Sequence, residues 1–249
     1  MIVDLCVMNS RIPVVIPTQK SKFDGLEIER LKVTTKNNPD FIFVIPKKNF
    51  RSFDPCGLSP VDVIVFDDYW FNSRASYNAF LLNNLFWETF SDFEKIVICQ
   101  VDAILIKSVL NLSDCSFPYV GSRWLPPKKC RVIRGKIYED YKKHFLLPFT
   151  EITVGNGGLS LRSPKIMLFV LNQLKLQGRY QELLNGDYNE DIVFSLFLKL
   201  IGFKMPDKVI VDSIFLERAS MGLHHVPDVY GFHALEKFNP DLQRLILKS

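Results

Sequence analysis

The sequence KIVICQVDAILI, at Lys95–Ile106, is apolar at nearly every position. A strand that is apolar on both faces is typical of a parallel sheet covered by helices on both sides. Three shorter apolar runs precede it and are also predicted as strands, at Ile12–Pro17, Phe41–Pro46 and Val61–Phe66. Together the four runs predict the centre of one sheet.

Amphipathic segments separate these strands. Helices are predicted at Leu26–Lys36 and at Ala75–Phe90, where leucines and phenylalanines recur at helical spacing. The resulting βαβαβ order predicts an α/β fold in a single domain, with a mostly parallel sheet flanked by helices. Such sheets bind ligands at the carboxyl ends of their strands.

The second half of the sequence is less regular. Two further helices are predicted, at Pro164–Leu176, with Gly178 placed to end it, and at Glu190–Ile201. The proline-rich segment Trp124–Lys129 is predicted to be a loop, and Lys208–Val211 a strand.

Composition limits the classes of protein that fit. The chain has 249 residues, of which 47% are hydrophobic and 23% charged, and this excludes a disordered chain. The net charge of +4 comes without a long basic stripe, so no nucleic-acid partner is expected. The densest basic stretch is Lys128–Arg131, with Arg134 and Lys136 nearby. It fits either a solvated surface or weak attraction to an anionic membrane or a phosphate-bearing ligand.

Several features predict a cytoplasmic protein. The five cysteines are scattered and none has CxxC spacing, as expected in a reducing compartment. Met1–Met8 carries an acid and no basic residue, unlike a secretory signal. No apolar run approaches the ~20 residues that span a bilayer. A peripheral contact with the inner face of the membrane stays open.

Asp102 is the first candidate for chemistry, because it interrupts an otherwise apolar run. An unpaired buried carboxylate is costly, so Asp102 is expected where the strand ends. There it could bind Mg²⁺ or Mn²⁺, or it could cap a turn. Asp67 and Asp68, at the end of another predicted strand, are a second candidate metal site. Phosphate-binding P-loop and dinucleotide-binding glycine motifs are absent from the sequence.

Three more motifs follow. Gly157 and Gly158, in the sequence GNGGLSLR, allow close approach of the backbone to a ligand, or form only a turn into the next element. Glu190 and Asp191 begin a helix, where acids suit the helix dipole, but one of them could also act as a general base. His233, near the end of the chain, could contact a metal or phosphate, or be structural.

The order of these motifs resembles the GT-A (Rossmann-like) class of nucleotide-sugar glycosyltransferases. The resemblance is closer to one group of bacterial polysaccharide-cluster glycosyltransferases, long known as a domain of unknown function. GNGGLSLR is its most specific part. The segments that carry the resemblance are Tyr77–Phe90, Gln100–Asp102, Tyr119–Trp124, Val154–Arg162, Asn189–Phe194 and Tyr230–His233.

The resemblance implies a Mn²⁺ or Mg²⁺ ion held by Asp102 and His233 against the donor diphosphate. Gln100 stands where the family's Asp-x-Asp motif begins, which leaves a non-catalytic binding module as an alternative. Asp191 is implied as the base that deprotonates the acceptor, with Glu190 binding sugar hydroxyls or orienting Asp191.

Further binding residues are implied with less specific motifs. On the donor side they are Pro17, Thr18, Arg74, Asn78, Gln100, Val101, Gly157 and Gly158. On the acceptor side they are Asn156 and Trp124, although Trp124 fits a core tryptophan equally well.

The implied function is transfer of a sugar from a nucleotide-sugar donor to a saccharide or lipid-linked saccharide in bacterial surface polysaccharide (O-antigen or capsule) synthesis. Inversion at the anomeric carbon is favoured. The nucleotide-binding half is placed at about residues 1–106 and the acceptor half at about 107–249. A sugar nucleotidyltransferase is a further alternative, disfavoured because Thr18–Asp24 contains no glycine.

Overall fold

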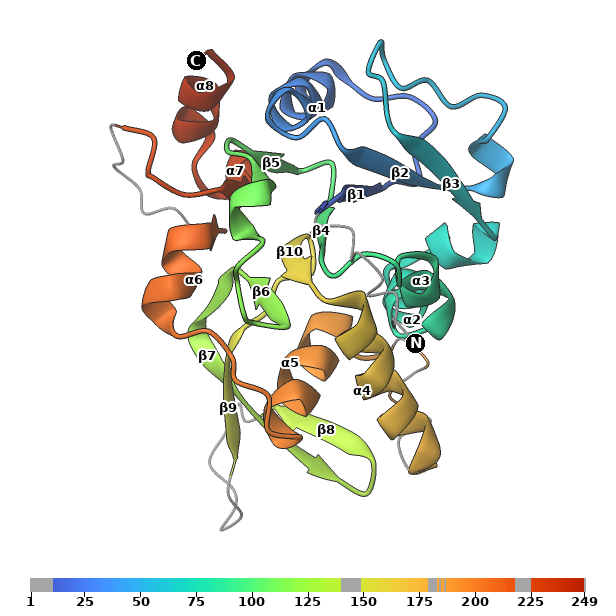
Figure 1. Ribbon diagram of the computed structural model, residues 1–249, viewed down its shortest axis with the longest axis vertical. Helices are drawn as coiled ribbons and strands as arrows, with labels where there is room; N and C mark the ends of the chain where they lie inside the picture. The colour runs from blue at the N-terminus through green and yellow to red at the C-terminus, as the bar shows by residue number, and fades with distance from the viewer. Residues whose placement is uncertain are drawn as a thin grey trace, which may run out of the picture.

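The protein is described from a computed structural model, which covers residues 11–139, 149–178, 183, 185, 187–217 and 225–248. Met1–Met8, discussed above as a non-signal segment, lie outside the described residues. A six-stranded sheet with the order β3-β2-β1-β4-β10-β6 runs through the molecule (Figure 1). Its strands are β1 (Val14–Pro17), β2 (Phe41–Pro46), β3 (Asp62–Phe66), β4 (Ile96–Cys99), β6 (Tyr119–Gly121) and β10 (Leu159–Arg162).

Two smaller sheets flank this one. The first has the order β11-β12-β5 and the second the order β8-β7-β9. Their strands are β5 (Ala103–Leu105), β7 (Arg123–Ile133), β8 (Lys136–Glu139), β9 (Thr150–Val154), β11 (Phe215–Leu216) and β12 (Gly231–His233). The α-helices are α1 (Gly25–Asn37), α2 (Arg74–Leu81), α3 (Asn84–Thr89), α4 (Pro164–Leu176), α5 (Glu190–Leu200), α6 (Lys208–Ile214), α7 (Leu235–Phe238) and α8 (Pro240–Lys248).

Helices cover both faces of the large sheet, because its central strands are apolar on both sides. Val15 and Ile42 pack into a core cluster with α2–α5, whereas Val14, Ile16 and Phe43 pack into a second cluster with α1 and α6. Figure 1 shows α1 on the opposite side of the sheet from α2–α5. The predicted α/β fold is therefore confirmed. No helix in the described ranges is long and apolar enough to cross a membrane.

The sheet is mixed rather than purely parallel, although five of its six strands run in one direction, as predicted. β1 pairs in parallel with β2 and with β4, as predicted, with Val14 opposite Phe41 and Val97. β10, however, runs antiparallel to both β4 and β6. No crossover helix precedes β10, since the short loop at 155–158 joins it to β9.

The apolar run Lys95–Ile106 is two strands, not one. β4 belongs to the large sheet and β5 to a smaller one, and a turn at Gln100–Asp102 separates them. The N–H of Ala103 donates to the carbonyl of Gln100 at 2.8 Å in this turn. The turn keeps the carboxylate of Asp102 out of the core, in line with the expectation that it marks a strand end.

The helix predicted at Ala75–Phe90 is also divided. Asn83 accepts a hydrogen bond from the N–H of Leu85 at 3.0 Å and so begins α3 as its N-cap. The predicted strand at Lys208–Val211 is the first part of α6, because the side chain of Asp207 caps that helix through the N–H of Ile210. Local side-chain capping outweighed the apolar pattern in both cases.

The expected loop Trp124–Lys129, with the basic stretch beside it, lies within strand β7. β7 pairs with β8 and β9, and its register with β9 shifts between Arg123 and Lys128. Pro126 and Pro127 lie in that irregular part, where their missing N–H groups cost no ladder hydrogen bonds.

The expectations for α4 are confirmed. Ser163 occupies the N-cap position, although its side chain makes no capping hydrogen bond, and Pro164 is the first helical residue. Gly178, with φ of +59°, follows the end of the helix as predicted.

Candidate functional site

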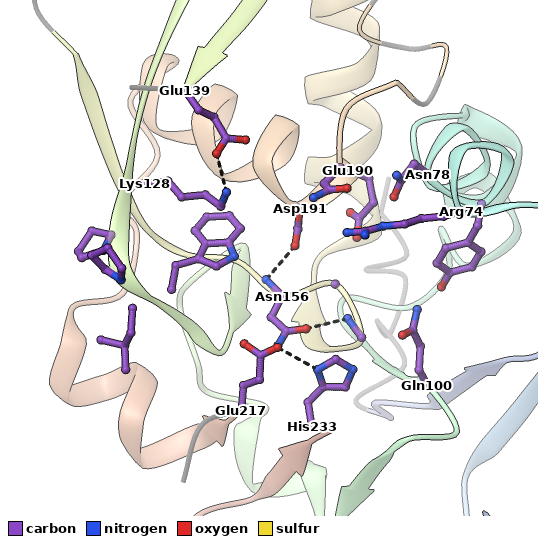
Figure 2. A pocket seen from close by; sticks show the side chains of 18 of the residues that line it. Arg74, Asn78, Gln100, Lys128, Glu139, Asn156, Glu190, Asp191, Glu217 and His233 are labelled. Carbon is purple, nitrogen blue, oxygen red and sulfur yellow. Dashed lines mark hydrogen bonds and ion pairs between the residues drawn. The ribbon is translucent and has the colours of Figure 1, made fainter. Parts of the chain in front are cut away.

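A cleft of about 1420 Å³ opens where β4 ends and β10 begins (Figure 2). Its walls are built from one face of α2, the β4–β5 turn, β7 with the end of β8, the loop at 155–158, the first turn of α5, Glu217 after β11 and His233 of β12. The lining residues named in the argument below are Arg74, Tyr77, Asn78, Gln100, Trp124, Lys128, Glu139, Asn156, Gly157, Gly158, Glu190, Asp191, Glu217 and His233. They come from positions far apart in the sequence, as expected at the carboxyl ends of strands in an α/β sheet.

The two glycines of the cleft floor are required by close contacts. A Cβ on Gly158 would lie 2.2 Å from Nε2 of His233 and 2.8 Å from Oε1 of Gln100. A Cβ on Gly157 would lie 2.0 Å from Oε1 of Glu190. The carbonyl of Gly158 also accepts from the N–H of Gln100 at 2.8 Å, which ties the loop to the end of β4. Only glycine lets this backbone lie so close to three polar side chains.

Asn156 links the loop to α5. Its backbone has a φ of +64°, and its N–H donates to Oδ2 of Asp191 at 3.1 Å. Its side-chain Oδ1 accepts from the N–H of Gly158 at 3.3 Å. Asn156 is 7% exposed, and its Nδ2 has no hydrogen-bond partner among the described residues. An unpaired buried donor in a cleft wall favours the binding of a ligand with an acceptor oxygen.

Asp191 is a half-buried carboxylate in the first turn of α5. Besides Asn156, the N–H of Ile192 donates to it, at 2.7 Å from Oδ1. Burial, together with the adjacent charge of Glu190, raises the pKa of Asp191 to about 6 against the opposing charge of Arg162. A carboxyl with a pKa near the working pH can exchange a proton readily, as a general base must.

Glu190 lies beside Asp191 but is fully engaged. Both of its oxygens accept from the guanidinium of Arg162, with 2.9 Å between Nη2 and Oε1. Glu190 therefore lines the cleft as the ion-pair partner of Arg162.

His233 lies between two carboxylates at the other end of the cleft. Its Nε2 is 3.4 Å from Oδ1 of Asp102, and its Nδ1 is 3.7 Å from Oε1 of Glu217. Burial opposes a charged ring, but the two carboxylates prevail and raise the pKa of His233 to about 9. Burial works to raise the pKa of Asp102, yet the hydrogen bond and charge of His233 lower it overall.

Asp102 and His233 fit a shared divalent ion. Neither ring nitrogen of His233 makes a hydrogen bond of good geometry, and the two side chains lie within reach of one ion. The described residues contain no group of three or more histidine, cysteine or acidic ligands suited to a metal. Mg²⁺ and Mn²⁺ sites often use one or two protein ligands and take the others from substrate phosphates and water. The pair therefore fits an ion of this kind.

Glu217 is the residue of this cluster that sequence reasoning missed. It belongs to no motif, and it follows the two-residue strand β11. Only the pairing of β11 with β12 brings it beside His233. No sequence signal could have identified it.

The other predicted donor residues divide into two groups. Arg74, Asn78 and Gln100 line the cleft, and Figure 2 shows Arg74 and Gln100 on the wall facing Asn156. Pro17 ends β1 and Thr18 follows it; both are buried, and neither is among the residues that line the cleft. Their predicted contact with the nucleotide is thus not reproduced.

Some predicted residues have structural partners. Neither Val101 nor Asp102 is among the residues that line the cleft: Val101 packs on the core around β1, and Asp102 is linked to the cleft through its contact with His233. Trp124 lines the cleft and also packs on the core cluster with α2–α5. Its ring lies so close to Gly155 that a Cβ on Gly155 would be 1.9 Å from it. Asp67 and Asp68 lie outside the cleft and accept from the N–H groups of Tyr69 and Lys48, each at 2.8 Å.

Comparison with protein families gives one match. Residues 60–226, more than half of the chain, match the model of a family described as protein of unknown function (DUF5672). The chain belongs to the DUF5672 family. A search of curated proteins found no match.

The DUF5672 match covers most of the cleft. Arg74, Gln100, Asn156 and Asp191 lie inside the matched range, whereas His233 lies beyond its end. In this DUF5672 protein the cleft therefore combines residues of the matched segment with one from the strand β12 that follows it.

Proposed function

We propose that this chain is a GT-A-type glycosyltransferase that moves a sugar from a nucleotide-sugar donor to a saccharide or lipid-linked saccharide acceptor, as in the synthesis of a bacterial surface polysaccharide. The arrangement of two unlike sites in one cleft carries the proposal. A carboxylate of raised pKa, Asp191, lies on one side of Asn156, and His233 lies on the other (Figure 2). Asp102 is not itself a lining residue, but its Oδ1 lies 3.4 Å from Nε2 of His233. Sugar transfer from a nucleotide-sugar donor needs a base for the acceptor hydroxyl and a separate site for the donor diphosphate, and these two sites can supply them.

The chemistry assigns a task to each group. Asp191 takes the proton from the acceptor hydroxyl, and the hydroxyl oxygen forms a bond with the anomeric carbon of the donor. The bond between that carbon and the diphosphate oxygen breaks, and its electron pair leaves with the diphosphate. A single displacement of this kind inverts the anomeric centre. Asp102 and His233 hold the diphosphate end, where a bound Mn²⁺ or Mg²⁺ would stabilise the developing negative charge.

The size of the cleft supports two substrates. Its volume of about 1420 Å³ exceeds the range of about 300–1,000 Å³ common for pockets that hold one small ligand. Arg74 and Gln100 line it on the α2 side, and Trp124 lines it on the β7 side. We place the donor against Arg74 and Gln100 and the acceptor against Trp124.

A thermal-shift screen of nucleotide sugars tests the proposal. Each of the UDP-, GDP-, TDP- and CMP-sugars is measured with Mn²⁺ and with EDTA. Because ligand binds only the folded state, a hundredfold excess over Kd adds about 2.7 kcal/mol to the free energy of unfolding. We expect one nucleotide class to raise the melting temperature in Mn²⁺ only, and Asp102→Asn to abolish this rise.

Asp68→Asn is the matched control, since Asp68 also follows a strand but accepts from the N–H of Lys48, whereas Asp102 contacts His233. This variant should keep the full shift. Donor binding without transfer or hydrolysis of the sugar would instead support a non-catalytic binding module, the alternative that Gln100 keeps open. No shift with any donor would refute the assignment of Asp102 and His233.

The pH dependence of transfer follows from Asp191. The base must be ionised, so kcat should be constant above a pH of about 6 and fall tenfold for each unit below it, since the pKa of Asp191 is raised to about 6. Steady-state rates between pH 4.5 and 8 give the profile. A rate that rises as the pH falls through 6 would show that the group acts in its protonated form.

A further inference from the structure

Arg162 is the most deeply buried charge beside the cleft. It ends β10 and the motif GNGGLSLR, and it is 0% exposed. Its Nη1 and Nη2 donate to the two oxygens of Glu190, and its Nε donates to Oγ of Ser160 at 2.9 Å. The guanidinium and the carboxylate thus form a bidentate ion pair, which fixes the orientation of the two groups and the distance between them.

Aromatic rings enclose this guanidinium. Its central carbon lies 4.6 Å from the ring centroid of Tyr119, 5.7 Å from that of Trp87 and 5.8 Å from that of Phe194. A planar guanidinium can stack on rings and keep a two-pronged ion pair together, which a lysine ammonium cannot do. The sequence therefore requires arginine at this position for its geometry as well as its charge.

The ion pair touches the reactive part of the cleft through Glu190. A Cβ on Gly157 would meet Oε1 of Glu190 at 2.0 Å and Nη2 of Arg162 at 3.2 Å, so the pair lies directly under the glycine loop. Asp191 is the next residue in the chain. Its carboxylate is held by the N–H of that same loop, at Asn156, and by the N–H of Ile192.

Stability alone does not account for this pair. Two charges taken out of water lose their hydration, and a buried ion pair is often no more stabilising than apolar side chains of the same shape. The Arg162–Glu190 pair has exposed fractions of 0% and 4% for its side chains. A buried pair at the wall of a cleft is thus a candidate for a role in that cleft.

We propose that Arg162 is a positioning residue: its ion pair with both oxygens of Glu190 holds that carboxylate under the glycine loop and beside Asp191, so that the charge of Glu190 acts on Asp191 at the cleft wall. The inference rests on the proposed function for its meaning, because Asp191 is the base of that reaction. It assigns Arg162 a role that neither the motif nor the family match gives it.

The charges around Asp191 agree with this role. The charge of Glu190 raises the pKa of Asp191, and that of Arg162 lowers it by a smaller effect. Tyr119, which packs against Arg162 from β6, has a raised pKa because it is buried, and it stays neutral. The other charged residues that line the cleft are Arg74 on α2, Lys129 on β7, the pair Lys128–Glu139, and His233 with Glu217. Asp102 contacts His233 but does not line the cleft.

Glu190→Gln is the first test. It removes the negative charge next to Asp191 and leaves the charge of Arg162, so the pKa of Asp191 should fall by about one unit or more. Carbon NMR of the protein labelled at aspartate carboxyl groups follows this pKa directly, with Asp191→Asn identifying the signal. In transfer assays the acid limb of the pH profile should shift to lower pH by the same number of pH units.

Glu236→Gln is the matched control. It breaks the ion pair of another buried arginine, Arg30, which is 4% exposed in its side chain and joins α1 to α7. This variant should lower the melting temperature without moving the pKa of Asp191. An unchanged pKa of Asp191 in a folded Glu190→Gln protein would overturn the proposal.

A double variant covers the case in which Glu190→Gln does not fold. Arg162→Met with Glu190→Gln leaves no buried charge unpaired. Since the effect of Glu190 is the larger of the two, the pKa of Asp191 should still fall, by less. A pKa that stays the same or rises would overturn the proposal. The NMR readout needs no substrate, so a failure of the transferase proposal is seen separately, as absence of transfer.

Discussion

Asp191→Asn is expected to lower kcat for sugar transfer by about 10²–10⁴-fold, the usual contribution of a general base. The two oxygens of the carboxylate accept from the N–H groups of Asn156 and Ile192. An amide has the same shape, but it keeps only one acceptor oxygen and cannot take a proton at neutral pH. Because the change is made on the acceptor side, the Kd for the nucleotide-sugar donor should change by less than about twofold. Steady-state kinetics and donor titration measure the two quantities.

The matched control for this prediction is Asp187→Asn. Asp187 is an exposed aspartate shortly before α5 in the chain, and its replacement should leave kcat unchanged. The residual activity of Asp191→Asn should also lose the acid limb near pH 6. Full activity in Asp191→Asn would remove Asp191 from the mechanism, and a large loss of donor affinity would make it a binding residue.

Gly158→Ala should impair donor binding strongly. The added methyl group would lie 2.2 Å from Nε2 of His233, so either the imidazole or the loop must move. A misplacement of about 1 Å at a reactive site can cost about 10²-fold in rate. We expect a loss of that order in kcat/KM, together with about 1–3 kcal/mol in the free energy of unfolding from overpacking.

Gly25→Ala is the control for this prediction. Gly25 begins α1, and a Cβ there would meet no atom within 4 Å. That variant should keep its kcat/KM and be as stable as the parent protein or slightly more so, because alanine suits a helix better than glycine. If Gly158→Ala binds donor as tightly as the parent, the glycine loop does not line the donor site.

Local patterns in the sequence predicted the parts of the fold that depend on burial. The apolar runs at β1, β2 and β4 became adjacent parallel strands because they can be buried on both faces. The prediction of one strand over Lys95–Ile106 was nevertheless wrong, because the second half of this run is β5, which pairs with β12 more than 100 residues later. Hydropathy identifies a strand but carries no information about its partner.

The candidate site was predicted where short motifs identify chemical groups. Gln100, Asn156, Asp191 and His233 all line the cleft. The partners of these groups were not predictable, because they depend on tertiary packing. In the sequence Arg162 is the last residue of the motif GNGGLSLR and has no evident partner. Its ion pair with Glu190 forms only when β10 and α5 pack together.

The place of β1 in the sheet bears on what makes an independent folding unit. β1 and β2 lie between β3 and β4, yet both precede the family-matched residues 60–226, and β12 follows them. A polypeptide trimmed to the matched range would lack β1, one of the two neighbours of β4. The backbone N–H and C=O groups of β4 that pair with β1 would then be exposed. Such edges are templates for aggregation. The segment shared across the family is therefore smaller than the unit that folds.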